Sequence, residues 1–496
     1  MKRAPIRSGC MAVVALWLAI LTGCAGGVFG TAGPDYSAPA STTAERWQAP
    51  LFNSSVAHEG SAQRLSAWWA QFNDAALDAL IAAAQAQSST LAQAAATIER
   101  ARADAIAAGV AASPSVDGIA SSNRSAFTLG GPATLRTQSL LGVQSRWEID
   151  LFGGLARERE SRQATLASKL ALWHDARVSL AAEVAGAYFN LRYCEIQVTR
   201  AEAETRSRGE TARITAAAER AGMQAASTVA LVQSAAADAA GALAQRRAQC
   251  DISIKGLVAL TAMDEPVLRT LLGGSARTGV TASAPATGLP EPSMFRIDAL
   301  PVRVLAQRPD IAAAERQLAA ASADIGSAEA ARFPRLTLSG NITPTRIAIG
   351  NAPALSLTTW SIGPSLEVPL LDGGRRSANV EAVRAQYAAA ESAYRARVRN
   401  AVREVEEALV RLASAATQLA ESESAARGYR ANLAAAQSML RTGLGSALQV
   451  EEARRPSLAA DAAVAALTHE RLAAWITLYR AAGGGWEPDA PAASRN

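Results

Sequence analysis

The chain has 496 residues, of which 19% are charged, 5% are aromatic and about a quarter are alanine. This composition excludes an intrinsically disordered, collagen-like or disulfide-dense protein and favours long helices that pack closely. The net charge is +5, and the arginines are interspersed with acidic residues instead of forming a basic patch, which argues against nucleic acid as a partner.

The N-terminus has the pattern of a bacterial secretory signal. Basic residues precede the apolar run 11–21, which is too short to span a membrane as a mature helix. The run ends in Leu21-Thr22-Gly23-Cys24, which is similar to a lipobox. We therefore predict a signal peptide at 1–23, lipidation of Cys24, and a Gly-, Ser- and Pro-containing tether at 24–66. A plain signal peptide with an incidental cysteine is the alternative.

Three sequence patterns occur twice, in the same order and at nearly the same offset. The matching segments are 101–116 with 321–336, 148–154 with 367–373, and 220–229 with 441–450. The chain is therefore predicted to contain two copies of one unit. The copies are placed at 67–263 and 311–485, with a linker at 264–310 that includes short helices at 265–272 and 298–306, and a tail at 486–496.

Each copy is predicted to contain a helix, a β-hairpin (114–151 or 334–371) and a long helical hairpin (154–263 or 374–485). The segment 375–440 contains no proline and carries apolar residues in a heptad seam with small residues between them. At 1.5 Å per residue, such a helix would be roughly 100 Å long. A compact enzyme domain fits helices of this length poorly.

Segments 141–151 and 358–370 alternate between apolar and polar residues over the length of a tilted transmembrane strand. Partner strands are expected near 115–128 and 335–349. The polar face carries the residues predicted to face a lumen, which are Gln144, Arg146, Glu148 and Glu367. An amphipathic sheet packed on a soluble core is the alternative.

Four strands cannot close a barrel, and open strand edges in lipid would leave backbone groups unpaired. Several chains must therefore share one barrel if the membrane interpretation holds. Two chains would give eight strands without an aqueous channel, and three would give twelve strands, which is wide enough for a pore.

Two cysteines of the expected mature chain lie equally far before and after Gly222. In an antiparallel helical hairpin that turns at Gly222, Cys194 and Cys250 would lie side by side. The periplasm is oxidising, so this arrangement predicts a disulfide. Two buried thiols that pack as small apolar groups are the alternative.

Six short motifs carry a family resemblance. They are Gly33-Pro34-Asp35-Tyr36, Trp68-Trp69, Asp150-Leu151-Phe152-Gly153, Arg308-Pro309-Asp310-Ile311, Phe333-Pro334 and Leu371-Asp372-Gly373-Gly374. With the duplication and the lipobox, they extend over nearly all of the mature chain. The chain resembles the bacterial outer membrane factor family, the TolC-like exit ducts, and specifically the NodT-type efflux lipoproteins.

The resemblance implies a mainly α-helical homotrimer with a transmembrane β-barrel in the cell outer membrane. Four strands per chain would form a shared 12-stranded barrel, and coiled-coil-like helices would extend into the periplasm. A periplasmic adaptor would bind the tip turns, at Gly222, Met223, Gly443, Leu444 and Gly445, and link the duct to an inner membrane pump. The cargo would be drugs or other toxic compounds, and the duct itself would do no chemistry and need no cofactor.

One departure from the family concerns the gate. Many relatives carry an acidic residue after the Gly-hydrophobic pair of the second tip turn. Here the turns are Gly222-Met223-Gln224 and Gly443-Leu444-Gly445-Ser446, and neither contains an aspartate. A gate in this protein would have to be steric or use charges elsewhere.

Two other functions stay open at the level of sequence. The same duct could serve type I protein secretion, or the chain could be a structural coiled-coil lipoprotein without a pore. An enzyme is not predicted, because no nucleophile–base pair or phosphate loop is present. The three histidines lie far apart and outside any metal-ligand spacing, so no metal site is predicted.

Overall fold

The computed structural model describes residues 30–39, 47–49, 68–128, 130–278, 289–290 and 305–486. The signal peptide, Cys24 and most of the tether lie outside these ranges, as do nearly all of the helix expected at 298–306 and of the tail. The chain divides into two compact units, each of which is described by itself. Unit 1 comprises 1–40, 96–170 and 313–395, and unit 2 comprises 41–95, 171–312 and 396–496.

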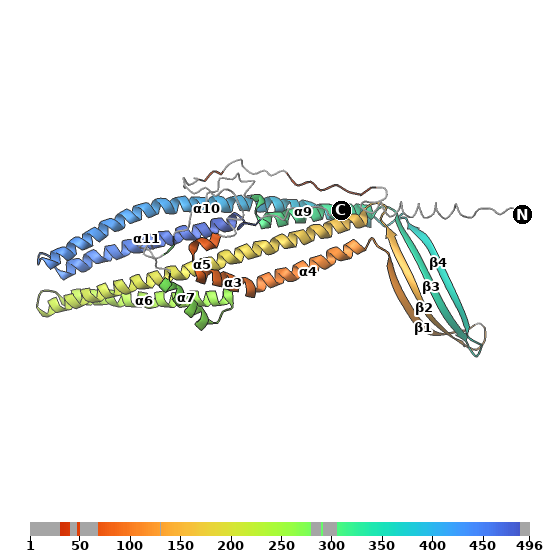
Figure 1. Ribbon diagram of the computed structural model, residues 1–496, viewed down its shortest axis with the longest axis horizontal. Helices are drawn as coiled ribbons and strands as arrows, with labels where there is room; N and C mark the ends of the chain where they lie inside the picture. Colours follow the sequence, from red (N-terminus) through yellow and green to blue (C-terminus); the bar gives the residue numbers. More distant parts are fainter. Residues whose placement is uncertain are drawn as a thin grey trace. The chain divides into compact units, whose positions relative to one another are not determined.

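Unit 1 contains one antiparallel sheet. Its strands are β1 (Ser115–Phe127), β2 (Thr134–Ile149), β3 (Arg335–Ile349) and β4 (Leu355–Glu367). They lie side by side in sequence order (Figure 1). Strand β2 pairs with β3, so the hairpins of the two copies join into a single sheet.

The strands begin and end earlier than the clean alternation predicts. The structure starts β2 at Thr134 and ends it at Ile149, where the prediction was 141–151. It starts β4 at Leu355 and ends it at Glu367, where the prediction was 358–370. An aspartate between each strand and the following helix prepares the start of that helix. Asp150 accepts a hydrogen bond from the Ala156 N–H, and Asp372 accepts one from the Gly374 N–H.

Two very long helices follow the hairpins. Helices α5 (Gly154–Arg220) and α10 (Arg375–Arg441) each have 67 residues, which corresponds to roughly 100 Å. Each turns back into a shorter helix, α6 (Ala226–Thr261) after α5 and α11 (Ala447–Ala481) after α10. No described helix combines the length and the apolar composition needed to cross a lipid bilayer.

The heptad seam predicted along α10 is confirmed. Every member of the seam is buried or half-buried, although more than half of the neighbouring positions are exposed. The seam consists of Val380, Val383, Tyr387, Ala390, Tyr394, Val398, Val402, Val405, Leu409, Leu412, Ala416 and Leu419. Small residues between these positions allow close approach of neighbouring helices.

The large apolar core lies in unit 2. The short helix η1 (Trp68–Phe72) places Trp68 in a stack with Tyr479 of α11, with a centroid separation of 5.1 Å. Helix α3 (Ala75–Gln87) adds Leu77 and Leu80 to this core, and Tyr188 and Phe189 of α5 are also fully buried. Helix α4 (Ser89–Val110) follows α3.

The predicted linker at 264–310 begins with a core helix. Helix α7 (Glu265–Thr278) is six residues longer than the expected 265–272 element. Its Leu268 and Leu272 are almost fully buried in the unit 2 core, so this part of the segment is anchored by apolar burial. The next described helix of the second copy is α9 (Pro309–Ala330), whose first residue is a proline, as is common at helix starts.

Candidate functional site

The turns that end the two helical hairpins have the same backbone design. Gly222 and Gly443 have φ values of +74° and +76°, a conformation that favours glycine. After α5, the Met223 N–H donates to the Ala218 carbonyl at 2.8 Å. After α10, the Leu444 N–H donates to the Met439 carbonyl at 2.9 Å. These bonds close each helix in a Schellman motif, which satisfies carbonyl groups at the helix end.

Both turns present an apolar side chain to the surroundings. Met223 is 71% exposed and Leu444 is 83% exposed. The second turn is additionally fixed by a capping box, in which Ser446 and Gln449 exchange hydrogen bonds at the start of α11. Each predicted tip set, Gly222-Met223 and Gly443-Leu444-Gly445, thus occupies one exposed helix–helix turn.

Polar contacts join the two hairpins a few turns away from the tip residues. Glu451 of α11 is 6% exposed and accepts a hydrogen bond from Ser207 of α5. Nearby, Arg455 of α11 donates to Thr211 of α5 at 3.4 Å. Sequence reasoning missed Glu451, because its partner on α5 lies hundreds of residues earlier in the chain. This buried carboxyl group lies near the tip, although both turns lack aspartate.

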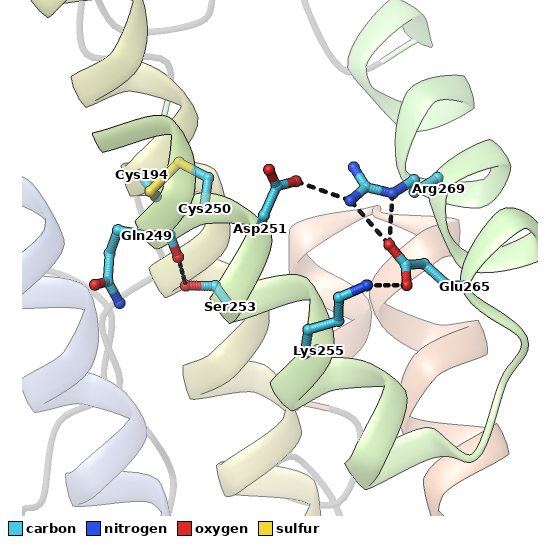
Figure 2. Close-up of polar contacts among 8 residues, drawn as sticks. All are labelled: Cys194, Gln249, Cys250, Asp251, Ser253, Lys255, Glu265 and Arg269. Carbon is cyan, nitrogen blue, oxygen red and sulfur yellow. Dashed lines mark hydrogen bonds and ion pairs between the residues drawn. A yellow bond between two sulfur atoms is a disulfide. The ribbon is translucent and has the colours of Figure 1, made fainter. Parts of the chain in front are cut away.

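Cys194 of α5 and Cys250 of α6 form a disulfide, with Cα atoms 5.6 Å apart (Figure 2). Beside it, α7 is held to α6 by ion pairs. Arg269 of α7 pairs with Asp251 of α6 at 2.8 Å, and Glu265 of α7 pairs with Lys255 of α6. Arg269 and Glu265 also pair with each other within α7 at 2.9 Å. These ion pairs are largely exposed and contribute little to stability, so the disulfide is the strong link in this region.

The predicted lumen-facing residues share one face of the sheet. Residues opposite each other in register point to the same side, and the register pairs Gln144 with Asn341 and Arg146 with Ser339. Glu148 pairs with Thr337, and Glu367 pairs with Arg335 on the same face. The opposite face exposes apolar side chains over half or more of their surface, namely Leu141, Val143, Ile342, Trp360, Ile362 and Leu366. An exposed apolar face of this size requires a partner or lipid.

Within unit 1, a buried arginine of α5 binds the N-terminal segment 30–39. The Arg157 side chain is 6% exposed and bonds to Asp35 at 2.6 Å and to Glu160 at 2.8 Å. Burial acts to lower the pKa of Arg157, but the bonds to the two carboxylates outweigh it and the pKa is raised. Asp35 belongs to the Gly33-Pro34-Asp35-Tyr36 motif, which therefore has a structural role here. Its partner Arg157 had no recognisable signal in the sequence.

A second buried arginine organises the start of α9 in unit 2. Arg308 bonds to Asp310 at 3.0 and 2.9 Å, to Glu404 at 2.8 Å and to the Ala481 carbonyl at 2.9 Å. Burial acts to lower the pKa of Arg308, but the two carboxylates outweigh it and raise the pKa. Burial, and then the charge of Asp310, raise the pKa of Asp175 nearby. The motif Arg308-Pro309-Asp310 thus has a structural role, because it joins the start of α9 to α10 and to the end of α11.

The described ranges offer no candidate metal site. No three side chains of His, Cys, Asp or Glu gather there in a way that could hold a metal ion. The arrangement consists of a two-faced sheet, paired long helices and exposed turns. These features suit a protein that assembles with partners around a passage for solutes.

Comparisons with known proteins agree with this arrangement. The family model for outer membrane efflux proteins matches residues 80–262 and 300–484. Nodulation protein T of Rhizobium leguminosarum bv. viciae is 30% identical over 92% of this chain and 90% of its own. The cation efflux system protein CusC of Escherichia coli O6:H1 is 28% identical over 94% of this chain and 97% of its own.

A solved structure shows the same fold. The outer-membrane channel OprN superposes with a TM-score of 0.74, at 28% identity, over 92% of this chain and 99% of its own. The predicted fold class is therefore confirmed as that of the TolC-like channels, mainly helical with a small number of strands. The family matches run through both copies of the duplicated unit, and the chain belongs to the outer membrane efflux protein family.

Proposed function

We propose that the chain is the outer membrane channel of a tripartite efflux system. It is a passive exit duct, which receives drugs and other toxic small molecules from a periplasmic adaptor and an inner membrane pump. Its family establishes a non-enzymatic efflux channel of the outer membrane. The observation that carries the proposal is the sheet with one apolar and one polar face, built onto paired helices whose turns expose apolar side chains.

The sheet supports assembly of three copies. Strands β1 and β4 are the two edges of the sheet, and in a lipid environment their backbone groups need partners. Pairing β1 of one copy with β4 of the next closes a barrel, and three copies give twelve strands. In this homotrimer the exposed apolar face meets lipid, and Gln144, Arg146, Glu148 and Glu367 line the lumen.

The N-terminus adds a lipid anchor at Cys24, the residue that follows the lipobox-like run. Cys24→Ala is expected to abolish acylation, while the barrel still inserts because its strands supply independent apolar surface. Mass spectrometry of the mature N-terminal peptide tests this expectation. An unmodified N-terminus at another residue in the wild-type protein would contradict it.

The tip turns are proposed to contact the adaptor. Replacement of Gly222 or Gly443 by valine forces a branched side chain into a left-handed conformation, at a cost of about 1–2 kcal/mol. If the turn shape is part of the contact surface, adaptor affinity falls about tenfold. Drug tolerance should therefore fall in cells that depend on this channel, at an unchanged outer membrane level.

A matched control for these variants is Gly241→Val in α6. Gly241 lies inside a helix, and an added Cβ there meets no atom within 4 Å. This variant should keep wild-type tolerance. Wild-type tolerance in both tip variants, at normal expression, would count against the adaptor contact.

The gate is proposed to use the buried contact between Glu451 and Ser207. Glu451→Ala removes a hydrogen bond to a charged group, which is worth about 1.5–3 kcal/mol. If this bond favours the closed tip, the open population rises about tenfold or more and conductance increases. The control is Glu452→Ala, because Glu452 is the exposed neighbouring acid. Equal conductance of the wild-type protein and both variants would show that the contact between Glu451 and Ser207 does not hold the tip closed.

A further inference from the structure

The outer face of the sheet, which is the face opposite to Gln144 and Arg146, carries charge at one level only. From the helix end as far as the row of Leu141 it has no charged side chain, and its hydroxyl groups are those of Ser145 and Thr358. The next two rows towards the hairpin turns differ from these. They consist of Ser122, Ser139, Arg346 and Ser356, followed by Arg124, Thr137 and Ala348. We call these two rows the basic band.

The two arginines of the basic band have no acidic partner. Arg124 and Arg346 are exposed, and their guanidinium groups form no ion pair or hydrogen bond with the residues that the structure describes. The acidic residues of the strands, Asp117, Glu148 and Glu367, all lie on the inner face. The hairpin turns 128–133 and 350–354 contain no charged residue. A neighbouring copy adds the same outer face, so the band is complementary to an anion from outside the protein.

The level of the basic band matches the outer edge of a lipid layer. The apolar rows extend from Ile149 to Leu141, which is about 27 Å of strand at 3.4 Å per residue. A strand tilt of about 40° reduces this to roughly 20 Å across the layer, slightly less than the roughly 25 Å of outer membrane barrels. At the helix end of these rows, the Trp147 indole N–H donates to the Ala112 carbonyl at 2.8 Å, a placement typical of tryptophan at a membrane interface. With the helices in the periplasm, the band lies among the headgroups of the outer leaflet.

A hollow beside Arg346 gives the basic band room for a ligand. Its volume is about 380 Å³, and the row between its two walls forms the floor. The walls are the band row Ser139, Arg346 and Ser356 and the neighbouring outer-face row Leu141, Pro344 and Thr358. The Ser139 hydroxyl lies 2.9 Å from that of Ser122, so a second hydroxyl adjoins the hollow. One wall is polar and the other is mainly apolar, which suits the two parts of an amphiphile better than it suits a free anion.

We propose that the basic band binds the phosphorylated headgroups of outer-leaflet lipids. The arginine guanidinium presents N–H donors in a fork that fits phosphate oxygens, and the neighbouring serine hydroxyls can donate to the same group. The apolar rows next to the band contact the acyl chains of the same lipid. In the trimer, the bands of three copies encircle the barrel and hold a ring of lipid around its exit. This inference rests on the proposed function, because it needs the barrel with its helices in the periplasm.

The test is native mass spectrometry of the purified full-length protein in detergent, titrated with bisphosphorylated lipid A. Dephosphorylated lipid A with the same acyl chains is the comparison lipid, and inorganic phosphate is the probe for a free-anion site. The variant Arg124→Gln/Arg346→Gln removes both charges of the band, whereas Arg124→Lys/Arg346→Lys keeps them. The control Arg332→Gln/Arg335→Gln removes two exposed arginines at the helix end of the sheet.

Bisphosphorylated lipid A should bind the wild-type protein about thirtyfold more tightly than the glutamine variant, which corresponds to roughly fivefold for each arginine. The lysine variant should fall between them, because it keeps the charge and loses the fork. The control should match the wild-type protein, and dephosphorylated lipid A should not distinguish the wild-type protein from the glutamine variant.

Equal affinity of bisphosphorylated lipid A for the wild-type protein and the glutamine variant would overturn the lipid site while the duct stands. Inorganic phosphate that displaces the lipid at equal concentration, or an acidic protein bound in its place, would overturn the lipid site as well. A parallel flotation assay uses vesicles of phosphatidylethanolamine and lipid A. Wild-type protein that stays monomeric and does not enter these vesicles would overturn the proposed function, and the lipid site with it.

Discussion

Replacing Arg308 by alanine is expected to lower the free energy of unfolding by about 3–5 kcal/mol. The side chain is 7% exposed and bonds to Asp310, Glu404 and the Ala481 carbonyl. Removal of the guanidinium leaves the buried Asp310 carboxylate without its partner. It also separates the start of α9 from the end of α11, since Arg308 bridges these segments.

The measurement is chemical denaturation of the detergent-solubilised protein, followed by tryptophan fluorescence. Trp68 and Trp475 lie in the unit 2 core and report on its packing. The matched control is Arg316→Ala, which removes an arginine that is 47% exposed and pairs with the neighbouring Glu315. Its loss should cost less than about 1 kcal/mol. Equal midpoints for the two variants would show that the buried network does not stabilise the fold.

Loss of the disulfide is expected to lower stability by about 2–4 kcal/mol. The bond joins residues 56 positions apart, so it closes a long loop and restricts the unfolded chain considerably. Cys194 and Cys250 are both buried next to the aromatic core, and the double variant Cys194→Ala/Cys250→Ala keeps each Cβ and removes only the two sulfur atoms. The change therefore reports mainly on the cross-link.

The same denaturation experiment with and without reductant tests this expectation. Reductant should lower the midpoint of the wild-type protein and leave that of the double alanine variant unchanged. Peptide mapping under non-reducing conditions gives an independent readout. Free, alkylatable thiols at Cys194 and Cys250 in the purified protein would refute the link.

The features that sequence could predict are those set by local periodicity and turn chemistry. The seam along α10 followed from apolar spacing, and the long helix limits followed from Gly154 and the glycines of the tip turns. The features it missed depend on partners far apart in the chain. Arg157 and Asp35 are 122 positions apart, and Ser207 and Glu451 are 244 apart. Neither pair lies in a repeating pattern.

The predicted strand limits were wrong for a physical reason, which the faces of the sheet explain. Clean alternation begins at Leu141 because Leu140 and Leu141, which are both apolar and adjacent in sequence, lie on opposite faces of the sheet. In β4 the apolar side chains likewise move from one face of the sheet to the other between Leu357 and Trp360. A rule that assumes one apolar face per strand therefore recognised only the part that fits the lipid layer. Helix α7 was also predicted too short, because it continues through Gly273 and Gly274, residues that disfavour a helix in sequence terms.

Single-channel recording of the purified full-length protein in a planar lipid bilayer shows whether the chain forms a conducting duct. We expect discrete conductance steps, because three copies of the chain would enclose one polar lumen. The steps should be larger for Glu451→Ala than for the wild-type protein, since that variant loosens the contact between the hairpins. The duct would be contradicted if the wild-type protein and Glu451→Ala both enter the bilayer folded, with the disulfide intact, and neither carries current.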